Sequence, residues 1–213
     1  MKYEIIGTGS KGNAAVIAGH ILVDCGVSYS RLKKYAGDLK IVFLTHAHGD
    51  HFNKTTIKNL ASDKPNLRFA CGEWLAKSLL DCGVSKSKID ILESGCEYSF
   101  GHIIAEPFAL THNVPNVGYK LTVGGERLIY ATDTGSLDGI AAKNFDLYLI
   151  EANHTEREIE SRIAEKLRSG EYPYEQKARE NHLSKEKADD FIYDNIGQNG
   201  SYVYLHTHDG III

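Results

Sequence analysis

The feature that most constrains this chain is a dense group of polar side chains directly after a short apolar run. Residues 40–44, KIVFL, are β-branched and aromatic and predict a buried strand. The next residues place three histidines and one aspartate within six positions: His46, His48, Asp50 and His51. If the extended geometry continues, the first two histidines project to the same side. Gly49 then permits a turn toward the last two members of the group.

The residue types in this group predict a metal centre. Imidazole nitrogens and carboxylate oxygens are suitable ligands for zinc, manganese or iron. An isolated histidine is usually a surface residue or a satisfied core residue. Four such side chains within six residues would instead repel one another or lack partners unless a cation held them. The residues alone do not distinguish among these metals.

Composition and charge limit what the rest of the protein can be. The chain has 213 residues, of which 42% are hydrophobic, which is enough for the core of one domain. Its net charge of −4 argues against a strongly basic nucleic-acid-binding surface but leaves room for a local basic groove. The four cysteines form no C-x-x-C pair and indicate free, mostly buried thiols in a reducing compartment. No signal-peptide pattern and no apolar stretch of 18 residues occurs, so we expect a soluble cytoplasmic protein with no membrane contact.

Apolar patterns predict how the chain is organised. We expect strands at 2–7, 13–18, 20–24, 40–45, 67–70, 89–92, 96–100, 102–110, 117–123, 126–131 and 146–150, and helices at 28–36, 54–62 and 72–82. Two further helices are expected after residue 154. The first has a capping box of Thr155 and Glu158 and ends at Gly170, and the second covers 184–197. The final residues, SYVYLHTHDGIII, predict a last strand.

Further ligand-type residues follow other predicted strands. His112 follows HIIAEPFAL, Asp133 follows RLIY, and His206 closes the last strand. Each is a weak signal alone, because a histidine or aspartate after a strand is often structural or solvated. Together with the first group they would complete two metal sites that share a bridging carboxylate.

The order of these motifs resembles that of the metallo-β-lactamase fold over nearly the whole chain. The resemblance implies an α+β fold, a single-domain αββα sandwich spanning 1–213 with one sheet from each half, and it leaves no room for the insert of β-CASP nucleases. It implies one metal on His46, His48, His112 and Asp133, and a second on Asp50, His51, Asp133 and His206. Asp24, in ILVDCG, resembles the family's strand end that orients a ligand histidine.

Other segments resemble one branch of that fold, the YycJ/WalJ-type phosphodiesterases. They are GTGSKGNA near the start, IEANH at 150–154, LRSGEYPYEQKAR at 167–179 and HLS at 182–184. The resemblance implies a 5′-to-3′ exonuclease acting on DNA. The chain departs from the group between Arg179 and His182, where its spacing is shorter.

The expected mechanism uses two divalent cations, Zn²⁺ or Mn²⁺, about 3.5–4 Å apart, which bridge a water and turn it into a hydroxide nucleophile at pH 7. Asp50 belongs to this catalytic centre as a ligand. His154 and His182 are candidates to protonate the leaving alkoxide or to contact a phosphate, and the alternative for each is a surface histidine. The role of His208 stays open.

Two other functions remain open at this stage. One is a small-molecule hydrolase acting on a cyclic phosphodiester or a thioester. The other is a non-catalytic binding module, against which the complete ligand set argues. A nucleic-acid partner would have to be held by two local basic clusters: Arg31, Lys33 and Lys34, and Lys177, Arg179 and Lys185. Ser10, Gly12 and Asn13 could contact a phosphate or simply form a turn.

Overall fold

The structure, a computed structural model, describes residues 1–207. This part of the chain contains two six-stranded sheets and six α-helices. It divides into two compact units, which are described separately below. The first unit comprises residues 1–98 and 114–117, and the second comprises residues 99–113 and the chain from residue 118 onward.

The first unit is built on a sheet of order β1-β2-β3-β4-β5-β6. The strands are β1 (Tyr3–Gly7), β2 (Ala14–Ile17), β3 (Ile21–Val23), β4 (Ile41–Leu44), β5 (Arg68–Cys71) and β6 (Ile89–Ile91). The first three pair antiparallel, whereas β3 to β6 run parallel. Parallel neighbours require crossover connections. The helices α1 (Tyr29–Ala36), α2 (Lys54–Asp63) and α3 (Glu73–Asp81) lie in these connections, the last followed by a short 3₁₀ helix, Lys86–Lys88.

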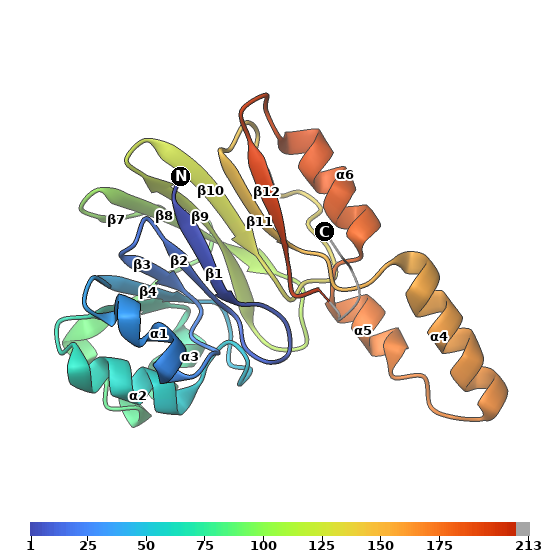
Figure 1. The fold of residues 1–213 in the computed structure, drawn as a ribbon, viewed down its shortest axis with the longest axis horizontal. Helices are drawn as coiled ribbons and strands as arrows, with labels where there is room; N and C mark the ends of the chain where they lie inside the picture. Colours follow the sequence, from blue (N-terminus) through green and yellow to red (C-terminus); the bar gives the residue numbers. More distant parts are fainter. Residues whose placement is uncertain (208–213) are drawn as a thin grey trace. The chain divides into compact units, whose positions relative to one another are not determined.

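The three helices of this unit pack on one face of its sheet (Figure 1). Leu32, Ile57 and Leu75, one from each helix, belong to the same buried cluster as Val42 and Phe69 of the sheet. The alternate residues of the central strands are buried as well. Both faces of these strands are therefore covered, which explains their continuous apolar sequences.

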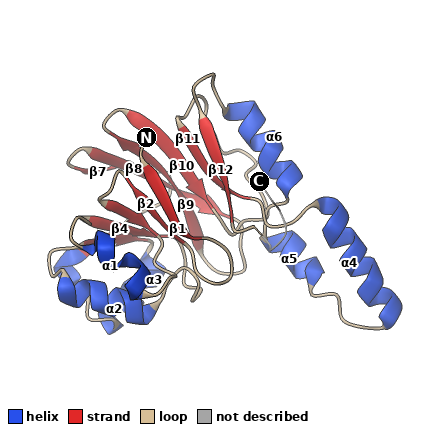
Figure 2. Ribbon diagram, viewed as in Figure 1, coloured by secondary structure: helices blue, strands red, loops and turns tan. Residues whose placement is uncertain are grey.

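The second unit is built on a sheet of order β12-β11-β10-β9-β8-β7. The strands are β7 (Tyr98–Phe100), β8 (Ile103–Leu110), β9 (Asn116–Val123), β10 (Glu126–Ala131), β11 (Leu147–Glu151) and β12 (Ser201–Leu205). Strands β10, β11 and β12 run parallel to one another. The helices α4 (Glu156–Ser169), α5 (Glu175–Asn181) and α6 (Lys185–Asn195) all lie between β11 and β12 in the chain (Figure 2).

The packing of these helices differs. Ala188, Phe191 and Ile192 of α6 join a buried cluster with Tyr148 and Ile150 of the sheet. In contrast, α4 buries only one residue, Ile159, and packs beside α5 (Figure 1). The predicted capping box of α4 is present, and its end at Gly170 has the left-handed φ of 74°.

The predicted fold class, a mixed α+β fold with one sheet from each half of the chain, is confirmed. The single-domain boundary of 1–213 stays a prediction. Helix α5 was not predicted, because its sequence EQKAREN has no apolar periodicity. The expectation of free thiols is confirmed: Cys25, Cys71 and Cys82 are buried, and Cys96 is exposed. Among residues 1–207, no helix combines the length and the apolar character needed to cross a bilayer.

Candidate functional site

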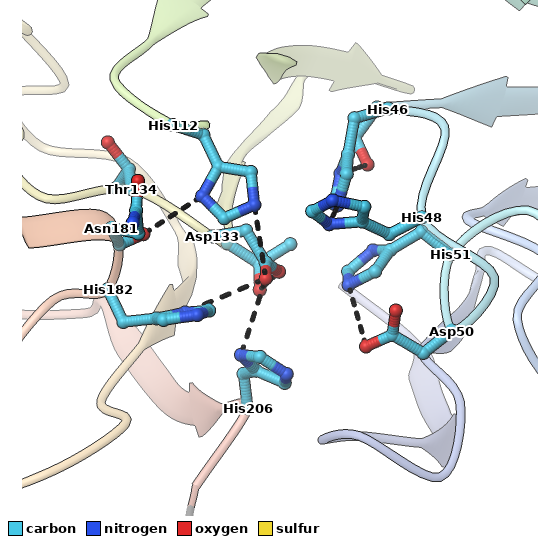
Figure 3. Close-up of polar contacts among 12 residues, drawn as sticks. His46, His48, Asp50, His51, His112, Asp133, Thr134, Asn181, His182 and His206 are labelled. Atoms are coloured by element: carbon cyan, nitrogen blue, oxygen red, sulfur yellow. Dashed lines mark hydrogen bonds and ion pairs between the residues drawn. The ribbon is translucent and has the colours of Figure 1, made fainter. Parts of the chain in front are cut away.

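In the first unit, the histidine-rich group follows the carboxyl end of β4. The strand ends at Leu44. The extended geometry that would have placed His46 and His48 on one side of a strand therefore does not continue through the group. His46 and His48 nevertheless lie together, with Nε2 of the first 3.1 Å from Nδ1 of the second (Figure 3). The predicted turn is present, since the amide of His51 donates to the carbonyl of His48 at 3.0 Å. Gly49 does not adopt a positive φ, and an added Cβ would meet no atom within 4 Å, so this turn does not require glycine.

A buried carboxylate, Asp24, orients two of these histidines. It follows β3 and has a φ of 59°, an unfavourable conformation for a residue other than glycine. Its Oδ2 accepts from Nδ1 of His51 at 2.6 Å, and its Oδ1 accepts from the hydroxyl of Thr45 at 2.9 Å. Because that hydroxyl donates to Asp24, its oxygen is left to accept from Nδ1 of His46 at 3.0 Å. The predicted contact between Asp24 and a ligand-type histidine is confirmed.

The Asp50 loop is held against the glycine-rich turn near the start of the chain. The Asn13 side-chain amide lies 3.2 Å from the carbonyl oxygen of Asp50 and 2.8 Å from Nε2 of His51. A Cβ at Gly26 would approach the same Asp50 carbonyl to 1.7 Å. The Asn13 amide therefore acts within the protein, which favours the turn interpretation of this segment over a phosphate contact. The Asp50 side chain keeps 24% exposure, and its Oδ2 lies 3.7 Å from Nε2 of His51.

In the second unit, Asp133 lies among three histidines (Figure 3). It follows β10 and has a φ of 57°. Its Oδ1 lies 3.6 Å from Nδ1 of His182 and 3.6 Å from Nδ1 of His206. Nε2 of His112 lies 3.9 Å from the same oxygen. The second unit therefore brings together four residues that the sequence had marked as ligands or as substrate contacts.

A fourth acidic residue, Glu151, was not predicted. It ends β11 and is fully buried. Its Oε1 accepts from Nδ1 of His182 at 2.7 Å and from Nδ1 of His206 at 2.9 Å. Its Oε2 accepts from two backbone amides, those of Thr134 at 2.9 Å and Leu183 at 3.2 Å. Asp133, Glu151, His182 and His206 each offer a ligand atom, and these atoms lie within 4.8 Å of one another.

The sequence does contain a signal for Glu151. The strand LYLIE is otherwise apolar, and all five of its residues are buried. A carboxylate almost never lies in such a strand unless other groups donate to it. A glutamate that closes a buried strand should therefore have been treated as a candidate, as Asp133 was.

The histidines in the two units share one orientation. In each of five, Nδ1 faces an oxygen acceptor of the protein. The pairs are His46 with Thr45, His51 with Asp24, His112 with the Asn181 carbonyl at 3.0 Å, and His182 and His206 with Glu151. Such a bond fixes the proton on Nδ1 and leaves the lone pair on Nε2. That lone pair faces the Asn13 side-chain amide at 2.8 Å in His51 and Nδ1 of His48 at 3.1 Å in His46. This is the usual orientation of histidines that bind a metal through Nε2, so the residues present fit divalent cations.

Glu151 and His182 also change each other's ionisation. Burial raises the pKa of Glu151, but the hydrogen bonds from His182 and His206 outweigh this effect and hold the pKa below its ordinary value. Burial lowers the pKa of His182, yet the hydrogen bond to Glu151 and the charges of Glu151 and Asp133 raise it overall. A negative Glu151 beside a readily protonated His182 is an arrangement suited to proton donation.

His154 does not belong to this cluster. It lies just before α4, and Nδ1 is 3.4 Å from Oδ1 of Asn153. It was predicted to serve the substrate together with His182, and only His182 adjoins Asp133 and Glu151. His208, whose role was left open, lies outside the described residues.

Half of the basic side chains expected to hold a nucleic acid have partners within the protein. Arg31 donates to the carbonyl of Ile6, Lys34 pairs with Glu4 at 3.1 Å, and Lys185 pairs with Asp189 at 2.7 Å. The other three are exposed: Lys33, Lys177 and Arg179.

Comparisons with known proteins agree with this fold. A family described as "Beta-lactamase superfamily domain" matches residues 20–191. No curated protein matches the sequence significantly. Among solved structures, the chain is similar to the metallo-beta-lactamase fold protein YhfI from Bacillus subtilis, with a TM-score of 0.74 and 18% identity over 98% of this chain and 87% of that chain.

Two more solved structures are similar over most of their length. The short form of human tRNase Z has a TM-score of 0.70 and 16% identity over 98% of this chain and 93% of that chain. Zn²⁺-bound PqqB from Methylobacterium extorquens has a TM-score of 0.66 and 14% identity over 97% of this chain and 89% of that chain. At such identities, these similarities establish the fold.

Proposed function

The chain belongs to the beta-lactamase superfamily, and on this premise we propose that it is a metal-dependent phosphodiesterase that cleaves nucleic acid. The superfamily consists generally of hydrolases, and one of the similar structures is a tRNase. Another holds Zn²⁺. These relations support a metal-dependent hydrolase, and the choice of a phosphodiester substrate follows the motif resemblance.

The observation that carries the proposal is the shared orientation of the five histidines, each with Nδ1 bound to an oxygen acceptor. It is supported by buried carboxylates at strand ends, Asp24 in the first unit and Asp133 and Glu151 in the second. We assign the ligands as the resemblance implies. One cation takes His46, His48, His112 and Asp133, and the other takes Asp50, His51, Asp133 and His206. Nitrogen and carboxylate ligands suit both Zn²⁺ and Mn²⁺.

Cations bound there would supply Lewis acidity at a phosphoryl oxygen and would lower the pKa of a water molecule. The protein's own residues orient the histidine rings and supply the proton for the leaving group. Asp24 and Glu151 orient histidine rings through Nδ1, and such partners typically raise metal affinity by about 10–100-fold.

We assign the leaving-group proton to His182. Its bond to Glu151 occupies Nδ1 and raises its pKa, which favours a second proton on Nε2 that the ring would give to the departing alkoxide. His154 lacks a carboxylate partner, and burial lowers its pKa, so it is the weaker candidate for this step.

The finer proposal is a 5′-to-3′ exonuclease on DNA of the YycJ/WalJ type. It rests on the motifs GTGSKGNA, IEANH and HLS. Exposed Lys33, Lys177 and Arg179 are available for phosphates, so affinity should fall as salt rises.

A substrate panel with added Mn²⁺ or Zn²⁺ tests this proposal. It contains linear DNA labelled at its 5′ end, covalently closed circular DNA, RNA, a chromogenic phosphodiester and a thioester. We expect short labelled products from linear DNA and an intact circle. The activity should vanish in His48→Ala and persist in His102→Ala, a matched change at an exposed histidine. Nicking of the circle would indicate an endonuclease. Turnover of only the small diester or the thioester would favour the small-molecule alternative.

A further inference from the structure

A cavity of about 210 Å³ lies in the second unit, lined by residues of α4, of α5 and of the segment before α4. It is separate from the Asp133 cluster: none of Asp133, Glu151, His182 or His206 lines it. Its apolar walls are Ile159, Ala178 and the ring of Tyr174. Ile159 is the one residue that α4 buries, and α5 buries none.

Two side-chain atoms of the lining residues are buried without a hydrogen-bond partner among the described residues: Nε2 of His154 and Oε2 of Glu175. His154 is only 6% exposed. The other carboxylate oxygen of Glu175 pairs with Lys166 at 2.8 Å. Burying a polar atom without a partner is costly, so each of these atoms needs one.

Both atoms are hydrogen-bond acceptors. Nδ1 of His154 faces Oδ1 of Asn153, which can only accept, so the ring proton lies on Nδ1 and Nε2 carries a lone pair. Burial lowers the pKa of His154, which keeps the ring neutral near pH 7. Glu175 is a carboxylate whose pKa is lowered by the hydrogen bond from Lys166. A ligand that satisfies both atoms must therefore bring N–H or O–H donors.

The charges that line the cavity and its volume further restrict which class of ligand it can bind. Two carboxylates, Glu158 and Glu175, line the cavity against one cation, Arg162, so a free phosphate is disfavoured. Pockets for drug-sized ligands usually measure about 300–1,000 Å³, so this cavity suits a single flat ring system. Tyr174 and the Arg162 guanidinium offer the kind of planar surface on which unpaired bases stack.

We propose that this cavity binds one unstacked nucleobase of the substrate strand and prefers a base whose edge presents N–H donors, guanine over thymine. This inference rests on the proposed function, because it supposes a polynucleotide substrate. It gives His154 a role in recognising the base, distinct from the proton transfer assigned to His182.

Nucleoside binding tests the proposal without any cleavage. Guanosine and thymidine are titrated into the intact protein, and binding is followed by ligand-detected NMR or calorimetry. We expect guanosine to bind more tightly than thymidine. Glu175→Gln keeps the shape but turns one acceptor oxygen into a donor, and it should weaken guanosine binding by about tenfold or more. Glu160→Gln, the same change at an exposed position of α4, should leave binding unchanged.

His154→Ala provides the second variant and should weaken guanosine similarly, with folding checked by circular dichroism. The proposal is overturned if neither nucleoside binds at the solubility limit, or if Glu175→Gln and Glu160→Gln bind guanosine equally. The outcome is separable from the proposed function. Guanosine binding without cleavage of any polynucleotide would keep the cavity and reject the nuclease. Cleavage without nucleoside binding would do the reverse.

Discussion

The two units assemble their polar clusters in opposite ways. In the first, His46, His48, Asp50 and His51 come from one turn after one strand. In the second, five separate places in the chain contribute, four of them at the end of a strand or within two residues after it: His112, Asp133, Glu151, His182 and His206. Both arrangements contain histidines whose Nδ1 is bound to an oxygen acceptor.

The device that orients the histidines is also the same in both units. A fully buried carboxylate near a strand end accepts the Nδ1 protons: Asp24 after β3 in the first unit and Glu151 at the end of β11 in the second. The two carboxylates differ in the number of histidine rings that each contacts directly. Asp24 contacts one ring directly and a second through Thr45, whereas Glu151 contacts two rings directly. The second unit should therefore be the more sensitive to loss of its carboxylate.

The largest effect is expected for Asp133→Ala, which removes the carboxylate assigned to both cations. Metal content should fall from about two ions per chain toward none, and activity should fall by more than the roughly 100-fold typical of losing an orienting partner. Elemental analysis of protein purified without chelator and the DNA assay measure both. Asp138→Ala, in the exposed loop after β10, is the control. Retention of both ions in Asp133→Ala would remove the bridging assignment.

The pair His206→Ala and His182→Ala separates two histidines that bind the same glutamate. His206 is assigned to a metal, so its loss should lower metal content and activity together. His182 is assigned to proton transfer, so its loss should lower turnover by about 10²–10⁴-fold while metal content stays near normal. Loss of an ion in His182→Ala would instead make it a ligand, as its place beside Asp133 and Glu151 also permits.

The first cluster comes from one turn and the second from five separate places in the chain, and this difference determines how well the sequence predicts each. The first cluster is local, so its density alone marks the metal centre. In the second unit, His112, Asp133 and His206 were found because each follows an apolar strand. Glu151 was missed because it sits inside the strand pattern, and its role depends on two imidazoles that only the folded chain brings to it. The partners of Asn13, Arg31 and Lys185 were equally invisible, since they depend on tertiary contacts.

Most strands and helices were predictable to within one or two residues because their apolar residues alternate or recur with helical spacing. Helix α5 was not, because a short polar helix has no such pattern and is fixed by packing against α4. At Gly49 the predicted turn is present, but the backbone has no positive φ there, so the turn does not depend on glycine.

A smaller effect should separate Glu151→Gln from Asp24→Asn. Both keep the shape of the side chain and remove its charge. Because Glu151 binds two rings directly, Glu151→Gln should weaken metal binding more, toward the upper end of the usual 10–100-fold range, and Asp24→Asn toward the lower end. Competition with a chromogenic chelator measures the affinities. Equal losses, or a larger loss for Asp24→Asn, would break the proposed difference between the units.

The smallest expected effects come from two glycines that approach backbone carbonyls, one in each unit. A Cβ at Gly26 would lie 1.7 Å from the carbonyl oxygen of Asp50, and a Cβ at Gly135 would lie 2.1 Å from that of Glu180. Neither has a positive φ, so the cost of alanine is steric. Overpacking of this kind typically costs about 1–3 kcal/mol in the free energy of unfolding.

Gly26→Ala should be the costlier of the two. The Asp50 carbonyl is held by the amide and side chain of Asn13, so it has little freedom to move. Glu180 lies near the exposed end of α5, where a small shift is easier. Urea denaturation measures both, with Gly49→Ala as the neutral control because its Cβ would meet nothing within 4 Å. If Gly135→Ala proves the more damaging, then α5, and with it the segment leading to His182, is held more rigidly than the histidine-rich turn of the first unit.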